Sequence, residues 1–108
     1  MRTIVFFDLP NIYSQDKRNY NIFRKYLIKE GFIMMQESVY SKITLNSQQS
    51  QALVERIKRK ATKKGIIQLL TITEKQYSQI QYIIGTNNNK IINSEDRLII
   101  LWKSKLIF

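Results

Sequence analysis

One carboxylate stands where it could take part in chemistry. Asp8 ends the apolar run at residues 4–7 and comes two positions before Pro10, the only proline of the chain. β-branched and aromatic residues favour a strand, and a proline stops its pairing. Counting by two places Asp8 on the face of Ile4 and Phe6. The carboxylate therefore needs a cation, a hydrogen-bond donor or water, since an unpaired buried charge is costly. Two interpretations stay open: a ligand for a divalent metal, or a solvated aspartate that begins the turn at Pro10.

The composition excludes several kinds of chemistry. The 108 residues include no cysteine and no histidine. A disulfide, a thiolate zinc site and a Ser-His-Asp triad are therefore excluded. With no histidine to act as a base, hydrolysis would have to use metal-bound water. No stretch has the pattern of a signal peptide or a membrane span, so we expect a cytoplasmic protein with no membrane partner.

The charge of the chain is strongly positive. Eighteen Lys and Arg against eight Asp and Glu give a net charge of +10. A domain this basic commonly binds a polyanion, and nucleic acid is the leading candidate. The alternative is a lysine-rich surface with no role in nucleic-acid binding. The length and the 44% hydrophobic content predict one folded domain with a single core.

The first predicted helix covers residues 17–30. Its apolar residues recur every three or four positions, Ser14 is a candidate cap, and Gly31 is expected to end it in a left-handed conformation. Its basic residues either follow phosphates or form the solvated side of an amphipathic helix. The candidate phosphate contacts here are Lys17, Arg18, Arg24 and Lys25.

Two short strands are predicted within residues 32–44, joined near Glu37 and Ser38, with one long bent strand as the alternative. Asn46 followed by Gln49 has the pattern of a capping box and predicts a second helix, which Gly65 is expected to close. The end of this helix is the most electropositive stretch of the chain. Some of its cations would also complement the helix dipole without any ligand. The candidate phosphate contacts here are Arg56, Arg59, Lys60, Lys63 and Lys64.

The remaining segments complete the predicted fold. The nearly continuous apolar run at 66–73 predicts a central strand, and 79–84 predicts an edge strand. The order predicts an α+β, ferredoxin-like βαββαβ sandwich over residues 1–85. Residues 86–108 are expected to be a linker and a C-terminal strand at 97–102. That strand either adds to the sheet of a second copy, which gives a homodimer, or folds back on its own sheet; we favour the dimer.

The same element order occurs in RNA-recognition motifs, but the third strand lacks their basic-glycine-aromatic pattern. Three stretches instead resemble one family: Val5-Phe6-Phe7-Asp8-Leu9-Pro10, the basic helix at 18–27, and residues 31–40 with their Gln-Glu-Ser-Val-Tyr turn. Together they resemble the CRISPR-associated Cas2 proteins, in the version found beside the single large effector nuclease of type II systems. The resemblance covers residues 1–85.

This resemblance implies a ferredoxin-like homodimer that joins the Cas1 integrase and holds a protospacer duplex during spacer acquisition. Family members are also described as metal-dependent endonucleases, with the first-strand aspartate, here Asp8, as the magnesium ligand. One carboxylate is a poor site for Mg²⁺, but a two-fold axis would bring two together. Ser38 would then orient water or contact phosphate, although a serine in a turn is more often structural.

Two classes of function follow from these observations. In the first, the chain is a scaffold that binds the phosphates of double-stranded DNA. In the second, it is a magnesium-dependent endonuclease that acts at Asp8 on DNA or on single-stranded RNA. A ribonuclease toxin of related fold is a third, weaker reading. The scaffold interpretation is favoured, because it accounts for the positive net charge, the segment at 86–108 and the expected dimer together.

Overall fold

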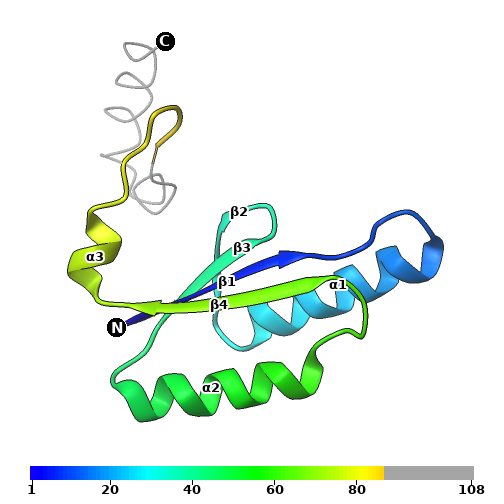
Figure 1. Cartoon of the computed structure of the whole chain (residues 1–108), viewed down its shortest axis with the longest axis horizontal. Helices are drawn as coiled ribbons and strands as arrows, with labels where there is room; N and C mark the ends of the chain where they lie inside the picture. The colour runs from blue at the N-terminus through cyan, green and yellow to red at the C-terminus, as the bar shows by residue number, and fades with distance from the viewer. Residues whose placement is uncertain (87–108) are drawn as a thin grey trace. The chain divides into compact units, whose positions relative to one another are not determined.

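The structure is a computed structural model, and it describes residues 1–86. Four strands and three helices follow in the order β1 (Arg2–Asp8), α1 (Ser14–Lys29), β2 (Ile33–Gln36), β3 (Val39–Ile43), α2 (Ser47–Lys60), β4 (Ile66–Ile72) and α3 (Glu74–Ser78). The strands form one antiparallel sheet in the order β2-β3-β1-β4. Helices α1 and α2 lie on the same side of this sheet (Figure 1). The ferredoxin-like α+β fold predicted from the sequence is confirmed.

The core lies between the sheet and these two helices. Val5, Phe7 and Leu9 alternate along the chain and point to the helices, where they pack with the buried faces of α1 and α2. Phe7 is central, because its ring lies 5.3 Å from that of Phe23 and 5.7 Å from that of Tyr40. Aromatic pairs at such distances stabilise a core beyond the area that they bury. The predicted alternation of β1 is therefore confirmed, and it leaves Asp8 on the opposite face.

The helix ends partly differ from the prediction. Helix α1 ends as expected, with Gly31 at φ +102° and its N–H donating to the Ile28 carbonyl. At the other end, the prediction that Ser14 caps α1 is wrong, because Ser14 is already helical and Tyr13 is the N-cap residue. Helix α2 begins as predicted, since Gln49 N–H donates to Asn46 Oδ1 at 2.8 Å.

The end of α2 and the role of Gly65 were predicted wrongly. The helix ends at Lys60, and Ala61 has extended backbone angles. Lys63 and Lys64 therefore lie in the loop that leads to β4. Gly65 ends this loop rather than the helix, and it has a φ of +92°. The cationic run misled the prediction, because lysines are equally compatible with a helix and with an exposed loop.

Strand β4 is an edge strand among the described residues, and the prediction that it is central is wrong. Its sequence looks central because both of its faces are apolar. Ile67 and Leu69 pack against the core, whereas Ile66 and Leu70 on the other face are exposed. An apolar run thus marks two hydrophobic faces, and it does not reveal how many neighbours a strand has.

The segment after β4 also differs from the prediction. The expected polar link contains the short helix α3, and residues 79–84 do not form the predicted edge strand. Arg2 holds α3 in place: its guanidinium donates to the Glu74 carboxylate at 3.0 Å and lies 3.8 Å from the centre of the Tyr77 ring. The predicted C-terminal strand at 97–102 lies outside the described residues. No helix among the described residues is long and apolar enough to cross a membrane.

Candidate nucleic-acid interface and acidic site

Asp8 lies at the end of β1, on the sheet face that the helices leave open. Its side chain is exposed, and it pairs with Ile66 at the start of β4. A shallow pocket of about 250 Å³ brings Asp8 together with Ser38 from the β2–β3 turn. The two candidate catalytic residues thus line one pocket, and their catalytic roles stay predictions.

The backbone of Asp8 is held by its neighbour across the strand pair. A Cβ built on Gly65 would lie 2.5 Å from the Asp8 carbonyl oxygen and 3.0 Å from Leu9 Cα. Only a glycine fits this close approach, and its positive φ also disfavours other residues. Gly65 thus allows the loop before β4 to pack closely against the backbone of Asp8 and Leu9.

Ser38 stabilises this turn through its backbone conformation and its hydrogen bonds. Its φ is +69°, which is uncommon for a residue with a side chain. Its carbonyl accepts from Phe7 N–H at 3.0 Å, and its hydroxyl shares a 2.9 Å hydrogen bond with Tyr20 Oη. These contacts fix the turn beside Asp8, and they favour a positioning role for Ser38.

The described part of one chain does not hold enough ligands for a divalent metal. No group of three or more carboxylates occurs among residues 1–86. Mg²⁺ prefers six oxygen ligands and commonly uses one or two carboxylates with water and phosphate. Asp8 alone supplies a single carboxylate, so one copy does not fit the ion, and a second copy would have to supply another.

A cluster of cations surrounds one acid on the helical side of the fold. Glu30 accepts from Arg56 Nε at 2.7 Å and from Tyr26 Oη at 2.8 Å, and Lys42 Nζ donates to its backbone carbonyl. The hydrogen bond from Arg56 is the main cause that lowers the pKa of Glu30, against the opposing effect of burial. Burial first, and then the hydrogen bond to Glu30, raises the pKa of Tyr26. Arg59 lies near enough to oppose that rise.

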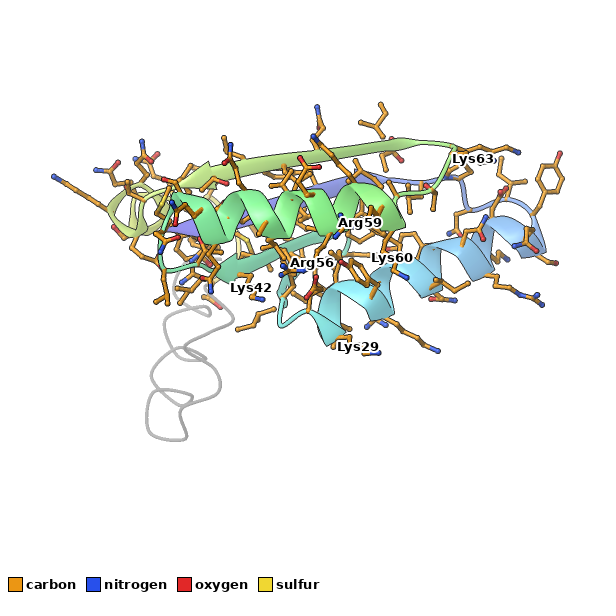
Figure 2. All side chains as sticks on the ribbon, turned by 90° about the horizontal axis from the view of Figure 1, so that it is seen from below. Lys29, Lys42, Arg56, Arg59, Lys60 and Lys63 are labelled. Atoms are coloured by element: carbon orange, nitrogen blue, oxygen red, sulfur yellow. The ribbon has the colours of Figure 1, made fainter. Side chains whose placement is uncertain are left out.

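These cations continue toward the end of α2 and form what we call the cation band. Figure 2 shows its members, which come from α1, β3, α2 and the following loop: Lys29, Lys42, Arg56, Arg59, Lys60 and Lys63. Four of the six were predicted from the sequence. Lys29 and Lys42 were missed, because each lies far in sequence from the others. An isolated cation in a strand gives no signal until the fold places it beside a helix end.

The other predicted contacts lie elsewhere. Arg24 donates from Nε to the hydroxyl of the buried Tyr40 at 2.8 Å, so it has a structural role. Lys17, Arg18 and Lys25 are exposed on α1. Lys64 lies in the loop after α2, where it lines a second pocket, of about 580 Å³. The band therefore draws mainly on the second helix.

The open face of the sheet is strongly apolar. Phe6 pairs with Val39 on one side and Gln68 on the other, and all three point away from the helices. Four large side chains on this face are about half exposed or more: Ile33, Ile43, Ile66 and Leu70. Several large apolar side chains exposed on one sheet face favour an interaction site. Asp8 lies at one end of it.

Comparison with known proteins identifies the family of this chain. The family model described as CRISPR associated protein Cas2 matches residues 1–80. A protein of Treponema denticola named CRISPR-associated endoribonuclease Cas2 is 48% identical over 101 residues, which cover 94% of this chain and 100% of the relative. Proteins with the same name from Streptococcus mutans and Ligilactobacillus salivarius are 46% and 41% identical, each over 94% of this chain and over 93% and 100% of the relative, respectively. The chain therefore belongs to the CRISPR-associated protein Cas2 family.

Proposed function

We propose that two copies of this chain pair through the open sheet face and together bind double-stranded DNA, as a scaffold for the Cas1 integrase during spacer acquisition. The observation that carries this proposal is the cation band, whose six basic side chains come from α1, β3, α2 and the loop after it. Arg56 is occupied by Glu30, and the remaining exposed members are suited to phosphates. Contacts of this kind bind a duplex without reading its sequence.

The pairing follows from the open sheet face. Its exposed isoleucines and leucine would lose contact with water against a second copy, which is favourable at about 25 cal/mol per Å² of apolar area. A two-fold axis through this face would also bring two copies of Asp8 toward each other. The test is Leu70→Asp, which should shift the species measured by light scattering from dimer to monomer. Leu45→Asp is the control, because Leu45 is 83% exposed and follows β3 in a loop.

Duplex binding is tested by charge reversal within the band. Arg59→Glu with Lys63→Glu should weaken the binding of a labelled blunt duplex, measured by fluorescence anisotropy. The slope of log K against log salt should fall by about 0.9 for each lost phosphate contact. Lys58→Glu with Lys75→Glu makes the same change in net charge at two residues that are not members of the band. Arg56 is left unchanged, because its removal would leave Glu30 without its partner.

Equal losses of affinity in the two double variants would contradict the proposal, because net charge alone would then explain binding. A chain that remains monomeric and binds no duplex at low salt would contradict it entirely. Docking of the integrase, with residues 86–108 as its proposed contact, is tested by co-purification with Cas1 before and after truncation at residue 86.

A second candidate is a divalent-metal-dependent endonuclease that acts on single-stranded RNA or on DNA. Two observations favour it: the relatives are named endoribonucleases, and the exposed Asp8 lines a pocket together with Ser38. Because one copy supplies a single carboxylate, this activity depends on the proposed pairing. Cleavage that survives in the monomeric Leu70→Asp variant would contradict an Asp8 pair.

A further inference from the structure

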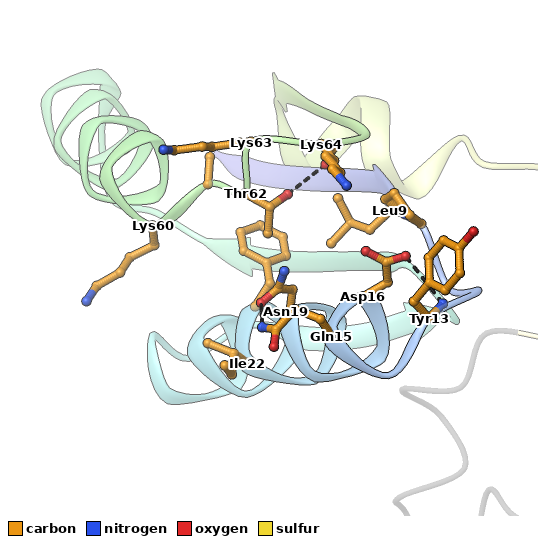
Figure 3. Close-up of a pocket in the computed structure, with 13 residues that line it drawn as sticks. Leu9, Tyr13, Gln15, Asp16, Asn19, Ile22, Lys60, Thr62, Lys63 and Lys64 are labelled. Carbon is orange, nitrogen blue, oxygen red and sulfur yellow. Dashed lines mark hydrogen bonds between the residues drawn. The ribbon is translucent and has the colours of Figure 1, made fainter.

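A pocket larger than the one at Asp8 lies on the helix side of the sheet, at the same end. It has a volume of about 580 Å³ and lies between the first turns of α1 and the loop after α2 (Figure 3). This volume falls within the range of about 300–1,000 Å³ that is typical of small-ligand sites. Neighbouring residues of one strand face the two pockets: Asp8 lines the shallow one, and Leu9 lines this one.

The lining of the pocket combines three kinds of group. Leu9, Pro10 and Phe23 form an apolar part, and Tyr13 contributes an aromatic ring that is 71% exposed. Lys60, Lys63 and Lys64 line the opposite side, with none of the described ion pairs among them. The side chains of Lys60 and Lys63 extend away from Tyr13, and that of Lys64 lies closer to it (Figure 3). The polar groups of α1 are Gln15, Asp16 and Asn19.

The polar groups of α1 retain hydrogen-bonding capacity. Gln15 Nε2 donates to Asn19 Oδ1 at 3.0 Å, which leaves the Asn19 amide N–H groups available. Asp16 Oδ2 accepts from Tyr13 N–H at 3.4 Å, and its second oxygen has no described partner. The facing loop is ordered by Thr62, whose hydroxyl donates to the Lys64 carbonyl at 2.8 Å. Donors, acceptors, an aromatic ring and cations thus surround one cavity.

We infer that this pocket binds one unpaired nucleotide of a nucleic-acid strand. Lys64 would hold its phosphate, the ring of Tyr13 and the apolar part would contact its base, and Asp16 and Asn19 would bond the base edge. Lys60 and Lys63 belong to both the pocket and the cation band, so a strand that leaves a duplex on the band can enter here.

This inference rests on the proposed binding of nucleic acid, and it adds a subsite that a blunt duplex does not use. The probes are single-stranded hexadeoxyadenylate, an abasic hexamer with the same backbone, and free deoxyadenosine monophosphate. We expect the natural chain to bind the hexadeoxyadenylate about five-fold or more tightly than the abasic hexamer. Five-fold is the lower end of the range for one stacked base, as suits a largely exposed tyrosine.

Substitution of Tyr13 gives the decisive comparison. Tyr13→Ala should remove the preference for the hexamer with bases, Tyr13→Phe should keep it, and neither should change the binding of a blunt duplex. Ile12→Ala is the matched control, because Ile12 is 80% exposed and does not line the pocket. Amide chemical shifts of Tyr13 and Asn19 should move when the hexadeoxyadenylate is added.

Equal affinity of the natural chain for the two hexamers would overturn the inference. So would an unchanged preference in Tyr13→Ala. If free deoxyadenosine monophosphate binds as tightly as the hexamer, the inference that a strand occupies the pocket is wrong. The ligand would then be a free nucleotide. Loss of duplex binding alone, with the base preference intact, would contradict the proposed function and leave this subsite standing.

Discussion

Replacement of Gly65 by alanine tests how the carboxylate of Asp8 is positioned. The substitution has two costs. A side chain at a φ of +92° is strained, by about 1–2 kcal/mol for the left-handed conformation. The new Cβ would also lie 2.5 Å from the Asp8 carbonyl oxygen, and displacement of a packed backbone costs about 1–3 kcal/mol more. We therefore expect Gly65→Ala to lower the free energy of unfolding by about 2–5 kcal/mol.

Gly31→Ala is the control that separates the two costs. Gly31 has a similar φ of +102°, but its nearest neighbour would be Lys42 Cε at 3.5 Å, which is an ordinary contact. It should therefore lose only the strain, about 1–2 kcal/mol. Urea unfolding measures both variants at one protein concentration, because association would shift the transition. Equal losses in the two variants would refute the reasoning and show that the loop before β4 yields without moving Asp8.

Three further predictions concern other contacts. Because the folded-state pKa of Glu30 lies below its ordinary value of 4.5, its ionised form stabilises the fold at neutral pH, and this contribution is lost as the pH falls through the folded pKa. Glu30→Gln should therefore cost about 1 kcal/mol at pH 7 and flatten the acid limb of the stability curve, as followed by urea unfolding; an unchanged acid limb would contradict the role of Glu30. Asp8→Asn should leave blunt-duplex affinity unchanged within about two-fold, since phosphate contacts dominate affinity, and should abolish Mg²⁺ binding in calorimetry; retained Mg²⁺ binding would exclude Asp8 as the ligand. Arg2→Met should release α3 at a cost of about 2 kcal/mol, because Glu74 loses its buried partner; hydrogen exchange at residues 74–78 should accelerate, and unchanged protection there would refute this role of Arg2.

The fold could be predicted from the sequence because the residues that specify each strand, helix cap and turn are compatible with the way in which these elements pack together. The alternation of Val5, Phe7 and Leu9 against Asp8, the cap at Asn46 and the turn at Ser38 each point to the same arrangement. The prediction from the sequence was wrong where one hydrophobic pattern is compatible with two different structures. The apolar β4 was taken as central because an exposed hydrophobic face has the same composition as a buried one.

The site was predictable only in part. Asp8 stands out as a charge at the end of an apolar strand, and the cations at 56–64 stand out as a run. The residues that lie near these cations do not stand out in the sequence. Glu30, Lys29 and Lys42 come close to the second helix only through tertiary packing. Gly65 was recognised as a backbone signal, but its effect on Asp8 depends on a close approach between β1 and β4 that sequence spacing does not encode. The pocket beside Tyr13 gave no signal, because its lining comes from segments about 40 residues apart.

The opposite orientations of Asp8 and Leu9 restrict how this chain can vary. A substitution in β1 alters one side chain, whereas an inserted or deleted residue shifts the strand by one position and exchanges its two faces. Such a change would carry the carboxylate into the hydrophobic interior and the leucine onto the surface. Homologues should therefore tolerate length changes in the loops around β1 while the number of residues between the first strand position and the aspartate stays constant.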